Sequence, residues 1–386
     1  MFLKICREEM RIMTMDRVLR SVVLVISLVV FAGWLTKPNA AAQSEQDVTT
    51  QTGVSSAVQL RVEPEDRAAS TIGTSGVRYH LYLAHTPAAK GVEADFPPIK
   101  FPQPVILDSE SSPTADSELA VNGSVASPPQ PAFYPADVTK LVSTGKTIAT
   151  AKSHPIFINC SPPGGSCWGN PTVFLTNLGA SNFIHLVDQY VGSTAVNRYT
   201  VGTSFTASVT IFAGTSGVPT LSENDILALV HSAAKIGGTG YGHVYHVFIP
   251  QGVDTCMDEG PCYSPDNPAT SAFCAYHFTV HFSDIGSVYY TVEPFQSVAG
   301  CEVPQPSPNG ALIDSTSSTL SHELFESITD PDINTGFRAL KSGAVLGDEI
   351  GDLCGGVLFG IFPLNAKNYE IQLEYSNFYH ACASTP

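Results

Sequence analysis

The residues best suited to chemistry lie in the stretch TLSHELFESITDPD, from Thr319 to Asp332. It holds a His-Glu-x-x-Glu pattern formed by His322, Glu323 and Glu326. Side chains four apart on a helix are about 5–6 Å apart at Cβ, so His322 and Glu326 could bind one metal ion. In zinc hydrolases this spacing supplies two ligands, and the Glu after the first ligand accepts a proton from metal-bound water. The pattern predicts a metal site with Glu323 as general base.

The same helix also has a purely structural reading. Leu320, Leu324 and Ile328 recur at about 100° per residue and form one apolar side. Polar residues opposite such a stripe are typical of any surface helix. The second ligand position also holds Glu326, where His is more usual. The motif by itself leaves a metal-binding helix and an ordinary surface helix open.

The acidic segment LGDEIGDLCGG favours the metal site. Glu349 lies 23 residues after Glu326 and is the candidate third ligand, as in gluzincin-like sites. Asp352 could accept a hydrogen bond from the second ring nitrogen of His322 and fix its tautomer. The predicted site is a zinc ion bound by His322, Glu326 and Glu349. Calcium is the alternative, and its oxygen ligands would come from Asp330, Asp332, Asp348 and Asp352.

His277 is the one other histidine with a candidate role. It precedes His281 by four residues in FCAYHFTVH, a stretch typical of a β-strand. Residues four apart in a strand share a face but lie about 13 Å apart, so the pair cannot bind one ion together. His277 could still face the motif helix across a sheet and stabilise an oxyanion, or it is a buried structural residue. The other histidines that we read as structural are His185, His231, His243 and His246.

The N-terminus has the features of a signal peptide. Basic residues precede an uncharged apolar run from Ser21 to Leu35, and the small residues of KPNAAAQ predict cleavage before Gln43. The run holds about 15 residues, fewer than the roughly 20 that a membrane-spanning helix needs, although an uncleaved anchor is the alternative. We expect the mature protein to be secreted, extracellular or periplasmic, with no stable membrane anchor.

Charge argues against nucleic acid as a partner. Residues 1–42 contain six of the 19 Lys and Arg residues and three of the 35 Asp and Glu residues. The chain from Gln43 therefore carries a net charge of −19. Such an acidic surface repels phosphate backbones and is compatible with binding cations.

Cysteine usage agrees with export. Cys6 leaves with the signal peptide, and the remaining eight of nine cysteines are an even number, as is typical of disulfides in exported chains. A thiolate zinc site is disfavoured because no paired CxxC spacing occurs. Sequence cannot select among the roughly one hundred pairings, so we join neighbours in order. The expected disulfides are Cys160–Cys167, Cys256–Cys262, Cys274–Cys301 and Cys354–Cys382.

Residues 43–150 differ from the rest of the chain. They are rich in Ser, Thr and Pro, and VRYHLYLAH is their one plausible strand, so we read them as a low-complexity, partly disordered extension. Strand and helix patterns follow in 151–386. NPTVFLTNLGASNFIHLVDQYV reads as helix, and SENDILALVHSAAKIGG reads as a helix with a capping box of Ser222 and Asp225. The predicted fold class is α+β.

The stretch 154–382 resembles the phosphate-induced protein 1/EXORDIUM-like secreted proteins, especially their microbial branch. The resemblance lies in LSENDI, YHVFIPQGV, FCAYH, VYYTVEP, SHELFESITDP and DEIGDLC, of which the last two are the most specific. The microbial relatives carry a zincin-like HExxE, which His322, Glu323 and Glu326 match. The resemblance implies a zincin-like α+β domain at 151–386, with a mixed twisted sheet backed by helices, including the motif helix near 317–329.

These observations predict a secreted metal-dependent hydrolase-like protein, a zinc metallopeptidase or its inactive relative, with a peptide as substrate. The plant members of the family are extracellular proteins without settled chemistry. The alternative is therefore a non-catalytic extracellular protein that binds a cell-wall polymer or a partner, with the helix motif structural or calcium-binding. The acidic departures TDPD and DEIGD from the plant pattern favour the metal site.

Overall fold

The structure is a computed structural model of the chain. It describes residues 57–62, 80–84, 86, 88, 132–133, 140–160, 165–214, 217–257, 261–333, 335–339, 349–355 and 359–386. All of them belong to one unit, Val54–Pro386. Among these residues no helix has both the length and the apolar character to cross a membrane. The predicted signal peptide, residues 1–42, lies outside the described residues.

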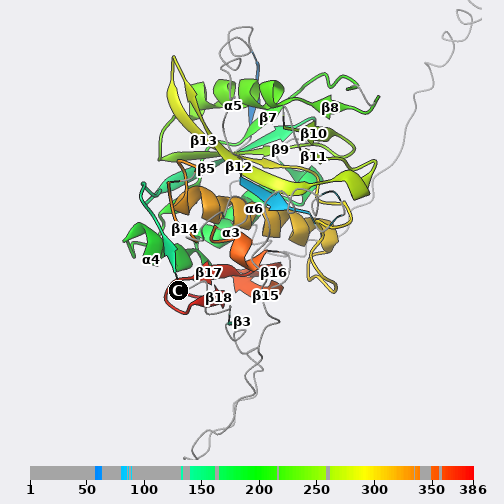
Figure 1. Ribbon diagram of the computed structural model, residues 1–386. Coiled ribbons are helices and arrows are strands. Elements are labelled where there is room, and N and C mark those ends of the chain that lie inside the picture. Colours follow the sequence, from blue (N-terminus) through cyan, green and yellow to red (C-terminus); the bar gives the residue numbers. More distant parts are fainter. Residues whose placement is uncertain are drawn as a thin grey trace, which may run out of the picture. The chain divides into compact units, whose positions relative to one another are not determined.

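A mixed sheet of eight strands forms the middle layer of this unit (Figure 1). Its order is β1 (Val58–Leu60), β7 (Phe205–Ala207), β5 (Ala151–Ile158), β9 (His243–Phe248), β13 (Gly286–Glu293), β12 (Phe273–Phe282) and β2 (His80–Leu83). The short strand β6 (Tyr199–Val201) also pairs with β5. Neighbours from β1 to β13 are parallel, whereas β12 is antiparallel to both β13 and β2. The predicted α+β class is confirmed.

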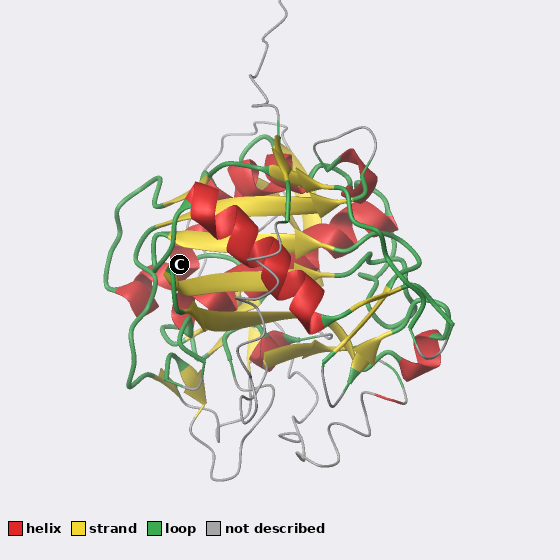
Figure 2. Ribbon diagram, turned by 90° about the horizontal axis from the view of Figure 1, so that it is seen from above, coloured by secondary structure: helices red, strands yellow, loops and turns green. Residues whose placement is uncertain are grey.

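One long helix lies over each face of this sheet (Figure 1). α5 (Glu223–Gly237) covers one face, and the view from above shows it lying across the strands (Figure 2). The predicted capping box begins it, because the Ser222 side chain accepts a hydrogen bond from Asp225 N and the Asp225 side chain accepts one from Ser222 N. α6 (Ala311–Thr329) lies on the opposite face and contacts β12 and β13.

Side-chain alternation gives the sheet one apolar face and one partly polar face. Tyr276 and Phe278 of β12 belong to the apolar core under α5. His277 lies between them in the strand, so its side chain points to the α6 side. The other polar side chains that alternation directs to the α6 side are those of His246, Thr291 and Glu293.

α6 is buried along almost its whole length. It begins at Ala311, ahead of the predicted start near 317, and every residue from Asp314 to Thr329 is buried. Besides β12 and β13, it contacts α3 (Pro171–Gly179) and β16 (Lys367–Gln372). The reading of the motif as the wet side of a surface helix is therefore wrong, because the polar side of α6 faces the protein interior.

The hydroxyl groups of α6 help it to be buried. Thr319 Oγ1 donates a hydrogen bond to Ser315 O at 2.9 Å, and Thr329 Oγ1 donates one to Phe325 O at 2.9 Å. These bonds satisfy polar groups within the helix itself. The motif side chains of His322, Glu323 and Glu326 instead contact one another, β12 and η4.

C-terminal strands lie on the side of α6 away from the large sheet (Figure 1). β15 (Phe359–Leu364) pairs with β16, and β17 (Glu374–Ser376) pairs with β18 (Ala381–Ala383), which also pairs with β3 (Ala132–Phe133). The smaller elements are β4 (Leu141–Val142), η1 (Ser166–Trp168), η2 (Phe183–Val187), α4 (Asp188–Val191), β8 (Thr220–Leu221), β10 (Asp254–Cys256), β11 (Cys262–Tyr263), η3 (Pro268–Thr270), β14 (Arg338–Ala339) and η4 (Asp352–Cys354).

The disulfide predictions are confirmed. All four expected pairs are bonded. Disulfides of this number are typical of proteins in oxidising, extracellular compartments. Cys354–Cys382 ties η4 to β18, and Cys274–Cys301 ties β12 to the segment that precedes α6.

Parts of the stretch 43–150 belong to the same unit as the later residues. β1 and β2 are strands of the large sheet, and β3 and β4 pair with β18 and β14. The boundary predicted near residue 150 therefore does not divide the described residues. β2 lies within the one strand predicted there, whereas β1, β3 and β4 were not predicted. The other residues of the predicted extension lie outside those described, apart from short segments without strands.

Candidate metal centre

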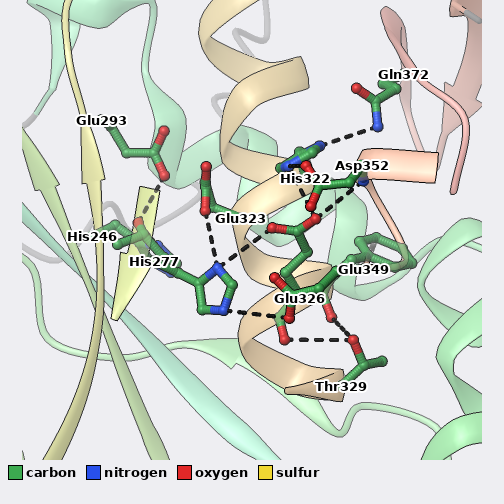
Figure 3. A network of polar contacts seen from close by, with 12 residues as sticks. His246, His277, Glu293, His322, Glu323, Glu326, Thr329, Glu349, Asp352 and Gln372 are labelled. Atoms are coloured by element: carbon green, nitrogen blue, oxygen red, sulfur yellow. Dashed lines mark hydrogen bonds and ion pairs between the residues drawn. The ribbon is translucent and has the colours of Figure 1, made fainter. Parts of the chain in front are cut away.

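Six side chains predicted to be functional converge between α6, β12 and η4 (Figure 3). α6 contributes three of them from consecutive turns, β12 contributes one, and the segment around η4 contributes two. None is exposed to solvent by more than a few per cent of its side chain. The six residues are His277, His322, Glu323, Glu326, Glu349 and Asp352.

Glu326 lies at the middle of this cluster. Its Oε1 is 3.1 Å from His322 Nε2, and its Oε2 is 3.4 Å from His277 Nδ1. The helical spacing of four brings His322 beside Glu326, as the sequence predicted. Strand alternation in β12 brings His277 to the opposite side of the same carboxylate. One carboxylate thus has an imidazole on each of its two oxygens.

His277 contacts two further carboxylates. Its Nδ1 is 3.3 Å from Glu323 Oε2, and its Nε2 is 3.8 Å from Glu349 Oε1. The sequence left open whether His277 faces the motif helix, and here it does. Its Nδ1 points to the motif residues, while the opposite ring nitrogen points to Glu349.

His322 is surrounded by Asp352, Gln372 and Tyr82. Its Nε2 is 3.7 Å from Asp352 Oδ1, and Asp352 N donates a hydrogen bond to Glu326 Oε1 at 3.1 Å. The Tyr82 ring of β2 stacks on the imidazole, with 4.2 Å between centroids. A Cβ atom at Gly351 would lie 2.5 Å from His322 Nδ1, so only glycine permits η4 to approach this closely.

Gln372 lies beside the second ring nitrogen of His322. Its Nε2 donates to Gly351 O at 2.7 Å and lies 3.1 Å from His322 Nδ1. The direction of the contact with His322 depends on which ring nitrogen carries the proton, and a cation at Nε2 would place that proton on Nδ1.

The carboxylates of the cluster have strongly altered acidity. Burial, with the nearby charges of Glu326 and Glu293, raises the pKa of Glu323. Burial, with the charges of Glu326 and Asp330, also raises the pKa of Glu349. Without a cation, both carboxyls therefore favour the protonated form.

The pKa values of Glu326 and His322, at the centre of the cluster, are shifted toward the charged forms of both groups. Burial opposes ionisation of Glu326, but the imidazoles of His322 and His277 outweigh it and lower the pKa of this carboxyl. Burial likewise lowers the pKa of His322, but Glu326 and Asp352 outweigh it and raise that pKa to about 9. Positive charge at this point is thus stabilised by the surrounding carboxylates.

Among the described residues, two groups of three have the composition and spacing of a metal site. One is His277, Glu323 and Glu326, the other is His322, Glu326 and Asp352, and the ligand atoms of each lie within 4.8 Å of one another. Ligands about 2.0–2.1 Å from a tetrahedral zinc ion are about 3.3 Å apart, close to the 3.1–3.7 Å contacts seen here. Imidazole and carboxylate together suit zinc, manganese or iron, whereas calcium prefers oxygen alone.

Glu349 and Asp352 lie in different surroundings from those that the sequence predicted. Glu349, predicted as a ligand, lies beside the outer ring nitrogen of His277 and belongs to neither group of three. Asp352, predicted to support His322 from outside the site, belongs to a group of three. The ligand set itself stays a prediction, because the contacts establish proximity and not ligation.

Two of the predicted calcium ligands, Asp330 and Asp332, make hydrogen bonds near the end of α6, whereas Asp352 belongs to the cluster. Asp332 accepts hydrogen bonds from the hydroxyls of Tyr241 and Tyr289. Asp330 accepts one from Gly336 N at 2.6 Å, which fixes the chain after α6. Asp348 lies outside the described residues. These contacts give Asp330 and Asp332 structural roles at the end of the helix.

Four residues of the site were not predicted. They are Tyr82, Glu293, Gln372 and Glu374. A weak signal exists for two of them, because EIQLE alternates polar Glu370, Gln372 and Glu374 with apolar residues across β16 and β17. Burial of both faces of those strands was not apparent from this pattern.

The comparisons with known proteins add no assignment. No family model, curated protein or solved structure matches the chain. Function has to be inferred from the site itself.

Proposed function

We propose that the protein is a secreted metal-dependent hydrolase, a metallopeptidase of zincin-like fold or an inactive relative of one. The observation that carries this proposal is the approach of two buried imidazoles, His322 and His277, to opposite oxygens of the buried Glu326 carboxylate. Water at its bulk pKa of about 15.7 is a weak nucleophile, and a bound divalent ion would supply the necessary polarisation. Zinc is the ion that we expect.

The residues of the chain would divide the remaining tasks. His322, Glu326 and Asp352 would hold the ion, since they form a compact group of nitrogen and oxygen donors. Glu323 would accept the proton of water, because its Oε1 is buried and makes no hydrogen bond to the described residues. His277, close to Glu323, would stabilise developing negative charge or take up the proton in turn.

Two features support the proposed zincin-like fold and the likeness to the EXORDIUM-like family. A mixed sheet with the antiparallel strand β12 next to its edge packs against a helix that carries HExxE, as expected of a zincin-like protein. SHELFESITDP and DEIGDLC, the most specific segments of the EXORDIUM-like resemblance, supply five of the six clustered side chains. The likeness to that family is therefore concentrated at the site.

The decisive experiment compares the purified secreted protein with Glu323→Gln. Casein and a peptide library are the substrates, and cleavage is read by mass spectrometry. We expect chelator-sensitive cleavage that falls by at least about 100-fold in Glu323→Gln. Glu302→Gln is the matched control, because Glu302 is exposed and lies outside the cluster. Cleavage that survives both chelation and Glu323→Gln would refute the proposal.

One observation favours the non-catalytic alternative. The cluster is buried, and Tyr82 covers His322, so a peptide cannot reach these atoms in the conformation present. An extracellular binding protein with a structural metal would have this closed site. In that case the protein binds metal but cleaves no member of the library, and removing the metal lowers its melting temperature.

A further inference from the structure

The cluster contains more donor side chains than one tetrahedral ion can bind. Four of its side chains are carboxylic acids, Glu323, Glu326, Glu349 and Asp352, and two are imidazoles, His277 and His322. A tetrahedral ion takes four ligands, so these six side chains offer enough donors for two ions that share a ligand.

We propose that this site binds two divalent transition-metal ions, bridged by the carboxylate of Glu326. This deepens the proposed function and rests on the metal centre proposed there, but not on hydrolytic activity. One ion would be bound by His322 and Asp352, the other by His277 and Glu323. Each set meets the shared Glu326 at a different oxygen.

The contacts of Glu326 carry the proposal. Oε1 faces His322 Nε2 and accepts a hydrogen bond from Asp352 N, whereas Oε2 faces His277 Nδ1. A carboxylate that presents separate oxygens to two donor sets has the geometry of a bridging ligand. Ions in two-metal hydrolytic sites lie about 3.5–4 Å apart, a distance that one carboxylate can span.

The outer contacts of His277 fit ligation through Nδ1. A histidine that binds metal through one ring nitrogen commonly donates the other N–H to a carboxylate or carbonyl. Here Nε2 of His277 is 3.8 Å from Glu349 Oε1, while Nδ1 points to Glu323 and Glu326. Glu349 would then orient His277, in the position that a supporting carboxylate takes in such sites.

Two buried carboxyl groups have side-chain oxygens that make no hydrogen bond to the described residues. Neither side-chain oxygen of Glu374 makes a hydrogen bond to the described residues, although the residue is fully buried. Oε1 of Glu323 also makes none, and its Oε2 is directed at His277. With Oε2 as a ligand, Oε1 would stay available to accept a proton, so the second ion is compatible with Glu323 as base.

Metal counting with Mn²⁺ tests the proposal. The mature chain is stripped with a chelator, titrated with Mn²⁺ at neutral pH and desalted, and bound metal is measured by mass spectrometry. Electron paramagnetic resonance reports whether two Mn²⁺ ions are magnetically coupled. We expect two ions per chain, with a coupled spectrum appearing as the second ion binds.

Variants assign each ion to its side of Glu326. His277→Ala and His322→Ala should each retain one ion and lose the coupling. Glu326→Ala should lose the coupling and weaken both ions by at least tenfold. His281→Ala is the matched control, because His281 lies on β12 but is exposed, and it should retain two coupled ions. The milder His277→Gln and Glu326→Asp replace any alanine variant that fails to fold.

Each result has a defined meaning. One ion per chain in the wild type, or two ions that survive His277→Ala, would overturn the two-metal proposal. Chelator-sensitive cleavage with a single ion would leave the proposed function standing while this inference fails. Two coupled ions without cleavage would support the two-metal inference and refute hydrolytic activity.

Discussion

Replacing Glu293 by Gln should stabilise the metal-free protein, and the gain should increase with pH. Glu293 is buried on the α6 side of β13, and burial raises the pKa of its carboxyl to about 8 from an ordinary 4.5. Between these values the folded protein retains a proton that the unfolded chain releases. The contribution of Glu293 to stability therefore falls as pH rises from about 4.5 through about 8.

The size of the effect follows from the shift. One pKa unit corresponds to about 1.4 kcal/mol, so Glu293 lowers the free energy of unfolding by about 1 kcal/mol at pH 5, about 3 at pH 7 and about 5 above pH 9. Gln has the same shape and no charge. It can still accept the hydrogen bond from Thr291 Oγ1, which lies 2.7 Å from Glu293 Oε1. We expect the two proteins to agree near pH 4.5 and to differ by about 3 kcal/mol at pH 7.

Denaturant unfolding of the chelator-treated protein at several pH values measures this difference. Glu302→Gln removes an exposed carboxyl and should follow the wild type at every pH. Binding of metal should also reduce the slope of the wild type, because positive charge at His322 already lowers the pKa of Glu293. Parallel pH curves for the wild type and Glu293→Gln would refute the assignment of a buried, protonated Glu293.

Three further perturbations test the surroundings of the cluster. Tyr82→Ala should speed removal of metal by a chelator at least tenfold, because the ring that covers His322 is lost; equal rates would show that metal leaves by another route. Gln372→Leu should weaken metal binding by about 10–100-fold, measured by competition with a chromophoric chelator, because His322 Nδ1 loses its only amide partner among the described residues. Replacing Cys354 and Cys382 by Ser should lower the free energy of unfolding by about 3–4 kcal/mol and weaken metal binding, since η4 carries Asp352; unchanged metal affinity would show that η4 is held by packing alone.

Local rules explain why parts of the fold were predictable. The capping box of Ser222 and Asp225 depends on residues three apart, and it begins α5 as expected. Cys256 and Cys262 were paired as neighbours, and they lie opposite each other in the antiparallel pair β10–β11. The helix expected from NPTVFLTNLGASNFIHLVDQYV is instead broken into α3, η2 and α4. A Cβ atom at Gly179 would lie 2.2 Å from Tyr199 O, so β6 approaches the chain closely where α3 ends.

The burial of α6 depends on contacts that sequence order does not reveal. Its apolar stripe predicts one buried side, but β16 and α3 cover other sides from distant parts of the chain. The site likewise combines contacts that local spacing predicts with contacts between distant parts of the chain. The helical spacing of His322 and Glu326 was readable, whereas the approach of His277 required the position of β12 in the sheet. The positions of Glu349 beside His277 and of Asp352 beside His322 depend on how η4 turns, which spacing alone does not fix.

The cost of this buried cluster distinguishes a functional site from a packing motif. Well-packed apolar residues in place of a buried ionic group are often neutral or stabilising by about 1–4 kcal/mol, so packing alone gives no reason for carboxylates beneath a sheet. The hydroxyls of Thr319 and Thr329 donate to the backbone of α6, but Glu323 Oε1 and both oxygens of Glu374 have no hydrogen-bond partner in the described part of the chain. A cation at Glu326 would compensate the acids on both of its sides and hold β12, α6 and η4 together. Stability and chemistry would then depend on the same ions, which is why metal content is the measurement on which the whole interpretation turns.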